Sequence, residues 1–284
     1  MFDKKWGNLP LAMVLCLCAC GTHGSTSQDE DPGADSLYTD TFQPDSAALE
    51  EEVLEQASPL AHVDDTFDDF LFAFARSRTL QAQRVSSPLY YTDDQGQQVQ
   101  MEQTNWRQEF AFLDAEFYTV LFGNEKQIEQ VKEQDLDSAS VERIDLQAMR
   151  VTDYTFHRME QGWMLTAVRG RHFLDLDLSD FLTFYTRFST DSIFQSESIA
   201  QPLRITMLDP DDDLQYIQGT IDADQWPIFC PEVPSGVISN IRYGQTYGNH
   251  RHVVMQKCGA ANGLQEILNF SKEGSRWLLT SYEN

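Results

Sequence analysis

The chain has 284 residues, 41% of them hydrophobic and 23% charged, with 45 Asp and Glu against 20 Lys and Arg and a formal net charge of −25. A surface this acidic repels phosphate backbones and anionic lipid headgroups, so we expect no nucleic-acid partner. The sequence has no Cys-x-x-Cys or His-Glu-x-x-His pattern and no EF-hand spacing. We therefore predict no metal site and no cofactor.

The N-terminus has the pattern of a bacterial secretory signal. Lys4 and Lys5 precede an apolar run, Leu9–Ala19, that is too short to span a membrane. The run ends in the letters LCACG, which resemble the lipobox of bacterial lipoproteins, with Cys20 in the position that becomes lipidated. We predict a lipoprotein signal peptide at residues 1–19 and a lipid anchor on Cys20. A plain secretory signal is the alternative.

Residues 20–62 are predicted to form a disordered acidic tether. From Gly21 to Leu60 the chain has ten acidic residues and no Lys or Arg, and so little apolar surface cannot repay the entropy of ordering. The letters QDED, close behind Cys20, resemble the surface-export signal of Bacteroidetes lipoproteins. A solvated tether without further meaning is the alternative. We expect the protein in the cell envelope, lipid-anchored in the outer membrane, either periplasmic or surface-exposed.

The tether is followed by a predicted helix and then by strands. Hydrophobic residues recur at helical spacing from Phe67 to Phe74, and Asp64 or Thr66 is suited to cap the helix N-terminus. Pro88 and the Leu after it end the helical region. The letters TDDQG then predict a turn, and strand patterns follow.

The same order of motifs occurs a second time. The matching blocks are DDFLFAFA with SDFLTFYT, LQAQRVSSPLYY with FQSESIAQPLRI, NWRQEFAFL with QWPIFCPEV, and FHRMEQGWMLT with FSKEGSRWLLT. We predict two tandem homologous α+β domains, residues 63–171 and 172–284, each a helical segment packed on an antiparallel sheet. Ser179 is the expected N-cap of the second helix. Because they recur in register, four tryptophans are assigned to the cores: Trp106, Trp163, Trp226 and Trp277.

This order of helix, Gln-x-x-Arg, Pro-Leu, loop Trp and final strand–turn–Trp strand resembles a family of two-domain Bacteroidetes lipoproteins of unknown function. The stretches FLTFYTRFSTDSIFQ, DPDDD, QWPIF and NIRYGQ carry the resemblance, which extends from Asp65 to Glu283. It implies the nuclear-transport-factor-2-like (NTF2-like) α+β cone, in which a curved sheet and helices can enclose a pocket. It implies no activity, because proteins of this fold include isomerases, dehydratases and pure binding modules.

Few side chains indicate a binding site. The letters NIRYGQTYGNHR place Tyr243 and Tyr247 beside glycines in a predicted turn, and loop aromatics often meet ligands. His250 and His252 are expected on the same side of a strand, which can begin a ligand site but cannot complete a zinc site. The acidic cluster Asp209–Asp213 lacks calcium-loop spacing, so we interpret it as a hairpin loop.

Cys230 and Cys258 are the cysteines outside the signal region. In an oxidising compartment they form a disulfide if their Cα atoms approach to about 6 Å, and a pair of buried thiols is the alternative. No nucleophile elbow or phosphate-binding glycine loop is present. We assign no catalytic residue. Acid–base chemistry has only loose candidates: His157, Asp153, Tyr154, Tyr118, Tyr243 and Asp191.

The sequence therefore predicts a non-catalytic lipoprotein that contacts the membrane through its anchor and binds a small molecule or a partner protein. The alternatives are a pocket enzyme that acts on a small molecule or glycan, and a structural scaffold that positions a partner. A deep pocket with two titratable groups in hydrogen-bond reach would favour the enzyme. Cones filled by their own Phe and Trp side chains would exclude it.

Overall fold

The computed structural model describes six stretches of the chain: residues 63–106, 117–132, 135–209, 212–229, 232–259 and 263–284. All of them belong to one compact unit, Leu54–Asn284. The predicted signal peptide, the anchor at Cys20 and the tether lie outside the described residues. Within the described part, no helix is long and apolar enough to cross a membrane. Below, residues 63–171 are called the first half and residues 172–284 the second half.

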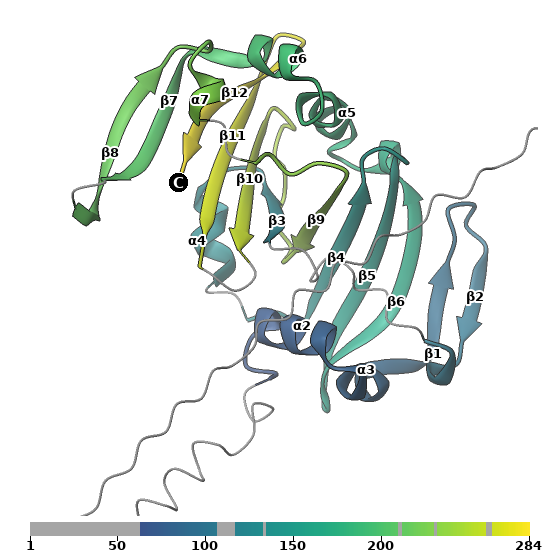
Figure 1. Cartoon of the computed structure of the whole chain (residues 1–284). Helices are drawn as coiled ribbons and strands as arrows, with labels where there is room; N and C mark the ends of the chain where they lie inside the picture. Colours follow the sequence, from purple (N-terminus) through teal and green to yellow (C-terminus); the bar gives the residue numbers. More distant parts are fainter. Residues whose placement is uncertain (1–62, 107–116, 133–134, 210–211, 230–231, 260–262) are drawn as a thin grey trace, which may run out of the picture. The chain divides into compact units, whose positions relative to one another are not determined.

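The first sheet has six strands in the order β2-β1-β6-β5-β4-β9 (Figure 1). Neighbouring strands are antiparallel except β1 and β6, which are parallel. The strands are β1 Val85–Thr92, β2 Gln98–Met101, β4 Ser138–Asp145, β5 Arg150–Met159, β6 Gly162–His172 and β9 Val237–Arg242. The helices of the first half are α2 Phe67–Arg76, α3 Arg78–Arg84, the 3-10 helix η1 Gln103–Asn105 and α4 Lys126–Lys132.

The second sheet has the order β3-β10-β11-β12-β7-β8, and only its β7–β12 pair is parallel. The strands are β3 Phe117–Phe122, β7 Ile199–Asp209, β8 Asp212–Ile221, β10 His252–Gly259, β11 Gln265–Glu273 and β12 Arg276–Glu283. The helices of the second half are η3 Phe173–Asp175, α5 Ser179–Phe188, α6 Ser192–Glu197 and α7 Trp226–Phe229. Each sheet thus has one parallel contact and four antiparallel contacts, one of which is the edge hairpin.

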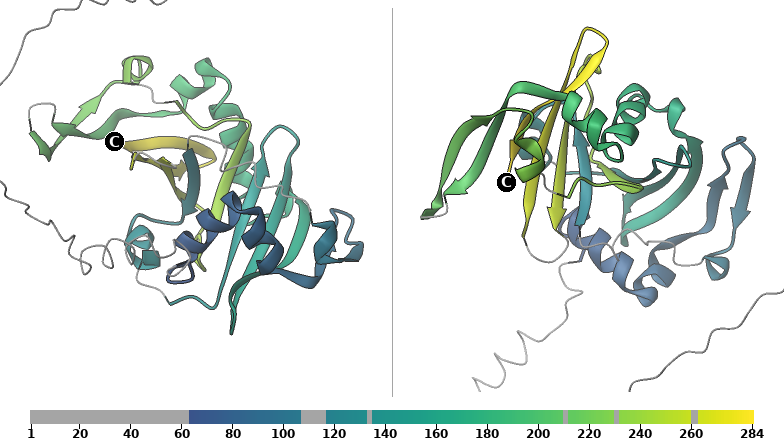
Figure 2. Two further views of the ribbon diagram at one scale, coloured as in Figure 1. Left: turned by 60° about the horizontal axis from the view of Figure 1, so that its bottom comes forward. Right: turned by 45° about the horizontal axis from the view of Figure 1, so that its top comes forward.

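Each sheet takes its last strand from the other half. β3 belongs to the first half by sequence but pairs with β10, and β9 belongs to the second half but pairs with β4. The two exchanged strands lie side by side where the sheets meet (Figures 1 and 2). The sequence-based division at residue 171 therefore separates each exchanged strand from the sheet that it completes.

Thr119 on β3 and Ser239 on β9 join the exchanged strands through four reciprocal hydrogen bonds. The Thr119 N–H donates to Ser239 Oγ at 2.9 Å, and the Ser239 N–H donates to Thr119 Oγ1 at 3.2 Å. Each hydroxyl also donates to the other residue's carbonyl oxygen, at 2.5 and 3.1 Å. Both residues are buried, so these bonds replace the water that would otherwise satisfy the backbone at the crossing.

Aromatic side chains fill the space between helix and sheet in each half. In the first half, the Phe67 ring lies 5.5 Å from Phe156 and 4.9 Å from Trp163. In the second half, the Phe181 ring lies 5.2 Å from Phe270 and 5.3 Å from Trp277. The core assignment is confirmed for three tryptophans, which are buried: Trp163, Trp226 and Trp277. Trp106 is half-buried and packs against the first core.

Two matched glutamines fasten the loop tryptophans. The Trp106 indole N–H donates to Gln81 at 3.0 Å, and the Trp226 indole N–H donates to Gln195 at 3.2 Å. Each glutamine amide in turn donates to a helix carbonyl, that of Phe74 or Phe188. The proline of each repeated block follows a cis peptide bond, Ser87–Pro88 in the first half and Gln201–Pro202 in the second. The Gln-to-Pro segment therefore has the same local structure in both halves.

Helix starts and turns agree with the sequence except at one cap. Thr66 Oγ1 accepts from the Asp69 N–H at 3.1 Å, which confirms it as an N-cap. The expectation for Ser179 is wrong: the N-cap of α5 is Leu178, and Ser179 is its first helical residue. Leu178 is buried, and its side chain makes no cap hydrogen bond to the first turn of α5. Both predicted loops join hairpin strands, β1 to β2 and β7 to β8.

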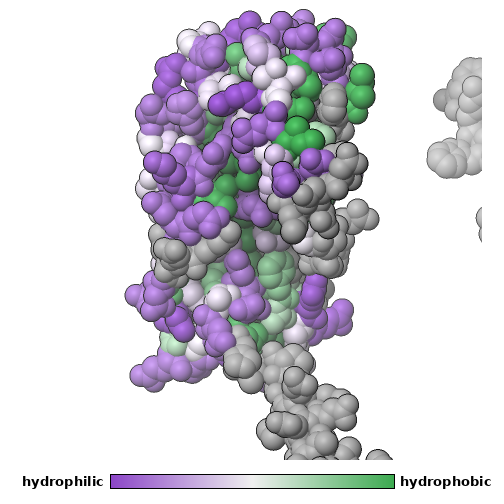
Figure 3. Space-filling view, turned by 90° about the vertical axis from the view of Figure 1, so that its left-hand side faces the viewer, coloured by the Kyte–Doolittle hydropathy of each residue, from purple (hydrophilic) through white to green (hydrophobic). Residues whose placement is uncertain are grey.

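The face that carries the β7–β8 hairpin is mostly hydrophilic, as the net charge requires. Hydrophobic side chains gather in a hollow along the middle of this face (Figure 3). On the hairpin itself the exposed hydrophobic residues include Leu208, Tyr216 and Ile217. Leu208 and Tyr216 are cross-strand partners, so they lie on the same side of the hairpin.

Candidate functional site

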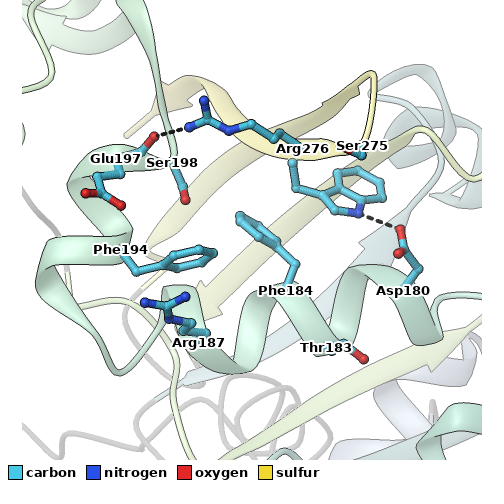
Figure 4. Close-up of a pocket in the computed structure, with 10 residues that line it drawn as sticks. Asp180, Thr183, Phe184, Arg187, Phe194, Glu197, Ser198, Ser275 and Arg276 are labelled. Carbon is cyan, nitrogen blue, oxygen red and sulfur yellow. Dashed lines mark hydrogen bonds between the residues drawn. The ribbon is translucent and has the colours of Figure 1, made fainter.

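An open cavity of about 830 Å³ lies in the second half, between α5, α6 and the start of β12 (Figure 4). Helix α5 contributes Phe184 and Arg187, and α6 contributes Phe194. Ser198 follows α6 directly, and β12 contributes Arg276 and Trp277. The volume is within the range of about 300–1,000 Å³ that is usual for small-molecule sites.

The aromatic side of the cavity is formed by three packed rings. The Phe184 ring lies 5.8 Å from Phe194, and it is stacked on Trp277 at 6.3 Å. Phe184 and Phe194 are half-buried, whereas Trp277 is 5% exposed. The two phenylalanines therefore offer apolar surface to a ligand, and the tryptophan fixes the position of Phe184.

Two arginines border this aromatic surface. The Arg187 guanidinium lies 4.1 Å from the Phe194 ring centre and bonds to the Asp191 carboxylate at 3.1 Å. Arg276 donates to the carbonyl oxygen of Glu197 at 2.8 Å, so its side chain extends from β12 to the end of α6 (Figure 4). Cations beside aromatic rings make a surface that accepts both charge and apolar contact.

The carboxylate at the other end of the cavity is already paired. Asp180 Oδ2 accepts from Lys272 Nζ at 2.6 Å and from the Trp277 indole N–H at 2.8 Å. The bond from Lys272 is the main reason that the pKa of Asp180 is lowered from its ordinary value. Asp180 is therefore an anion that positions Trp277, and it is a poor proton donor.

The matching place in the first half is occupied by an arginine. The repeated blocks align Arg84 with Ser198 and Gly162 with Arg276, and the strand pairing agrees, because Val85 opposes Leu165 as Ile199 opposes Leu279. Arg84 extends from α3 to donate to the Trp163 carbonyl oxygen at 3.4 Å and pairs with Asp64 at 2.7 Å. We call Arg84, Asp64, Gly162 and the Trp163 carbonyl the arginine clamp.

The clamp depends on the glycine. Gly162 has a φ of +97°, and a Cβ at this position would lie 2.2 Å from Arg84 Nη1. In the second half the arginine is instead Arg276, at the start of β12, and Ser198 stands in the position of Arg84. Because serine is much shorter than arginine, this exchange leaves the open space of the cavity.

A second cluster of polar groups lies where α2 of the first half meets Tyr243 and Cys258 of the second half. Asp68, in the first turn of α2, accepts a hydrogen bond from the Tyr243 hydroxyl at 2.7 Å. Tyr118 and Cys258 are cross-strand partners on β3 and β10 and lie next to this pair. Asp68 and Tyr243 both line two cavities, of about 240 and 290 Å³. Burial raises the pKa of Asp68 and of Tyr243, so both groups retain their protons to higher pH than usual.

The structure separates the four predicted ligand-binding residues. Tyr243 is in the pair with Asp68, and Tyr247 is buried in the core of the second half, where its hydroxyl accepts from Asn240 at 2.9 Å. His250 has a φ of +54° in the turn before β10, which begins at His252. The expectation that both histidines lie on one strand is therefore wrong, because the chain turns between them.

His252 lies beside a different cavity, a hollow of about 630 Å³ on the second sheet. Its Nδ1 is 3.0 Å from Ser271 Oγ. Cys230 lies outside the described residues, so the disulfide with Cys258 stays a prediction. Among the residues that the structure describes, no three His, Cys, Asp or Glu side chains are grouped to hold a metal ion.

The loose acid–base candidates also separate. Tyr118 and Tyr243 lie in the Asp68 cluster. The others have structural contacts: Asp153 with Arg171, Tyr154 in the first core, His157 with Thr166, and Asp191 at the N-cap of α6. Sequence reasoning missed Asp68, Ser198 and Arg276. The available signal was disagreement between the repeats, since Asp68 aligns with Ser179, Ser198 with Arg84 and Arg276 with Gly162.

The fold and the open cavity define an α+β protein of the NTF2-like class with a small-molecule-sized site. The chain is similar to an NTF2-like protein from Bacteroides fragilis NCTC 9343, with 36% identity over 80% of this chain and 98% of that one and a TM-score of 0.73. It belongs to the family described as "Domain of unknown function (DUF4348)", whose model matches residues 45–284. No curated protein matches the chain. The expected α+β NTF2-like fold and the resemblance to a family of unknown function are confirmed.

Proposed function

We propose that this protein is a lipid-anchored binding protein of the cell envelope of a Bacteroidetes bacterium, made of two tandem homologous NTF2-like units. It binds a small molecule, without catalysis, in the cavity between α5, α6 and β12. The lipobox at Cys20 and the acidic tether support the anchor. The similarity to a Bacteroides protein and the matching strand orders of the two sheets support the source and the duplication.

The observation that carries the binding role is the contrast between the halves. The arginine clamp occupies the site in the first half, whereas Ser198 and Arg276 leave it open in the second half. The space between helix and sheet is filled by aromatic rings in both halves. A ligand is therefore expected at the open cavity rather than inside a cone.

Among the residues that line the cavity, no two titratable side chains are hydrogen-bonded to each other as an acid–base pair, and the Glu197 carboxylate is exposed. The Asp180 carboxylate is held by Lys272 and Trp277, and Arg187 is held by Asp191. A general acid or base must exchange its proton near neutral pH, and a carboxylate with a lowered pKa next to two donors does not. The site is suited to recognition.

The test is to transfer the arginine clamp to the second half. We expect the double variant Ser198→Arg/Arg276→Gly to close the cavity, because it recreates the first-half residues at matched positions. Two dyes with one aromatic body serve as probes, neutral N-phenylnaphthylamine and anionic anilinonaphthalene sulfonate. At least one should bind wild type saturably and lose at least about tenfold in affinity in the double variant.

Gln218→Arg is the matched control, because it adds an arginine on the exposed strand β8, outside the cavity. Dye binding should be unchanged in this variant. If both dyes bound the double variant as well as wild type, the cavity would not be the binding site and the proposal would be refuted.

The Asp68–Tyr243 pair favours a second candidate, a pocket enzyme whose site lies between α2 and the segment that follows β9. A carboxyl and a phenol within hydrogen-bond distance between two cavities can exchange a proton with a substrate. Turnover of a small molecule that Asp68→Asn and Tyr243→Phe abolish, and that Ser198→Arg/Arg276→Gly retains, would establish this function. Turnover that both substitutions leave intact would exclude the pair.

A further inference from the structure

We infer that the ligand of the cavity between α5, α6 and β12 is an organic anion, whose acidic group pairs with Arg276 and whose apolar body lies against Phe184 and Phe194. The inference rests on the proposed binding function and names the class of ligand. It depends on which charged groups around the cavity already have partners and which still have hydrogen-bond donors to offer.

Two carboxylates near the cavity are neutralised within the protein, and a third, that of Glu197, lines the cavity and is exposed. Asp180 is bonded to Lys272 and Trp277. Asp191 is bonded to Arg187 and to the N–H groups of the first turn of α6, and the Phe194 N–H is the main reason that its pKa is lowered. A cationic ligand would therefore find Asp180 and Asp191 already paired, which leaves the exposed Glu197 as the remaining carboxylate of the cavity lining.

Arg276, in contrast, still has hydrogen-bond donors to offer. A guanidinium has five N–H donors, and among the described residues one hydrogen bond from Arg276 is present, to the uncharged Glu197 carbonyl. Guanidinium donors are arranged to bind two oxygens of one acidic group. A carboxylate or sulfonate from a ligand would give Arg276 the ionic partner that this contact does not.

The first half contains that partner within the protein. There the arginine of the clamp, Arg84, also donates to a backbone carbonyl oxygen, but it is paired in addition with the Asp64 carboxylate at 2.7 Å. In the second half, no salt bridge to Arg276 occurs within the described part of the chain. Arg84 thus has its carboxylate partner within the protein, whereas the ionic partner of Arg276 is to come from a ligand.

The surroundings support one orientation of the ligand. Phe184 and Phe194 are half-buried and lie beside the arginines in Figure 4. Arg187 already stacks on Phe194 at 4.1 Å, which places a second positive charge near the aromatic surface. The chain has a net charge of −25, so a local excess of arginine donors is needed to attract any anion to this protein.

The two dyes test separately whether the cavity binds a ligand and whether it prefers an anion. N-phenylnaphthylamine and anilinonaphthalene sulfonate share one aromatic body and differ by the sulfonate. We expect wild type to bind the sulfonate at least about tenfold more tightly, as a charge-assisted pair requires. Arg276→Gln, which retains a donor for the Glu197 carbonyl, should remove this preference and change the affinity for the neutral dye less than about twofold.

Three results would decide the matter. Loss of the sulfonate preference in Arg276→Gln, with both dyes lost in Ser198→Arg/Arg276→Gly, supports the anion. Equal or weaker binding of the sulfonate, with the neutral dye lost in the double variant, overturns the anion but leaves the binding site in place. Binding of both dyes that the double variant does not affect overturns the site itself and the anion with it.

Discussion

The arginine clamp of the first half makes Gly162 a position where even alanine should destabilise the protein. A Cβ there would lie 2.2 Å from Arg84 Nη1 and 2.3 Å from Asp64 Oδ1. Asp64 Oδ1 also accepts from the Trp163 N–H at 2.9 Å. Gly162→Ala must therefore separate the ion pair and disturb the bond that holds the start of β6.

The cost follows from two contributions. A positive φ costs an L residue about 1–2 kcal/mol, and Gly162 has a φ of +97°. Displacing partly buried hydrogen-bonded groups costs about 1–3 kcal/mol, and the Arg84 and Asp64 side chains are 15% and 29% exposed. We expect Gly162→Ala to lower the free energy of unfolding by about 2–5 kcal/mol, measured by urea denaturation.

Gly274→Ala is the matched control for the backbone contribution. Gly274 lies in the corresponding turn of the second half with a φ of +60°, and a Cβ there would meet nothing within 4 Å. It should cost only the backbone strain, about 1–2 kcal/mol. If Gly162→Ala and Gly274→Ala destabilised the protein equally, Arg84 would not be clamped against Gly162 and the contrast between the halves would lose its basis.

Three further predictions concern the core, the strand exchange and the Asp68 pair. Trp163→Ala and Trp277→Ala should each lower the free energy of unfolding by about 3–5 kcal/mol, and an unchanged thermal unfolding curve in either would contradict its place in the core. Thr119→Val and Ser239→Ala should each cost about 1–3 kcal/mol. Their double variant should cost less than the sum, because the bonds are reciprocal; full additivity would mean that the two residues act separately. Burial raises the pKa of Asp68 from 3.8, so the folded state holds the proton more tightly than the unfolded chain. This contribution to stability is lost as pH rises through the raised pKa. Asp68→Asn should therefore reduce the fall in stability that urea unfolding shows as the pH rises above about 4, and an unchanged pH dependence would be the contrary result.

The sequence predicted the local structure of both halves because local structure depends on local chemistry. Helical spacing located α2, and the choice of Asp64 or Thr66 as N-cap placed its N-terminus to within two residues. Turn-forming letters located the edge hairpins. Three of the four tryptophans that recur in register proved to be buried core residues, since a position used twice in the same way serves the framework that both halves share.

The strand exchange could not be predicted in the same way. The letters FYTVLF of β3 and VISNIR of β9 are both suited to a buried strand, and alternation of side chains does not specify which sheet a strand joins. Tyr243 shows the same limit. In the sequence it is an aromatic residue of a loop, and its hydrogen bond to Asp68, 175 residues away, is visible only in the folded structure.

The binding cavity was missed because its residues are ordinary for an exposed surface. Ser198 and Arg276 form no motif, and their meaning depends on the first half, where Arg84 and Gly162 stand in the matched positions. The predicted ligand residues were chosen instead for being aromatic or basic in a glycine-rich turn. Comparison of the aligned repeats, position by position, is the sequence signal that locates the site.

We propose that the residues at two matched positions, Arg84 and Gly162 in the first half and Ser198 and Arg276 in the second, close the site in the first half and open it in the second. The most direct test is the number of anilinonaphthalene sulfonate molecules bound per chain, measured by titration calorimetry. We predict about one for wild type and none for Ser198→Arg/Arg276→Gly. One dye per chain in both proteins would contradict this proposal.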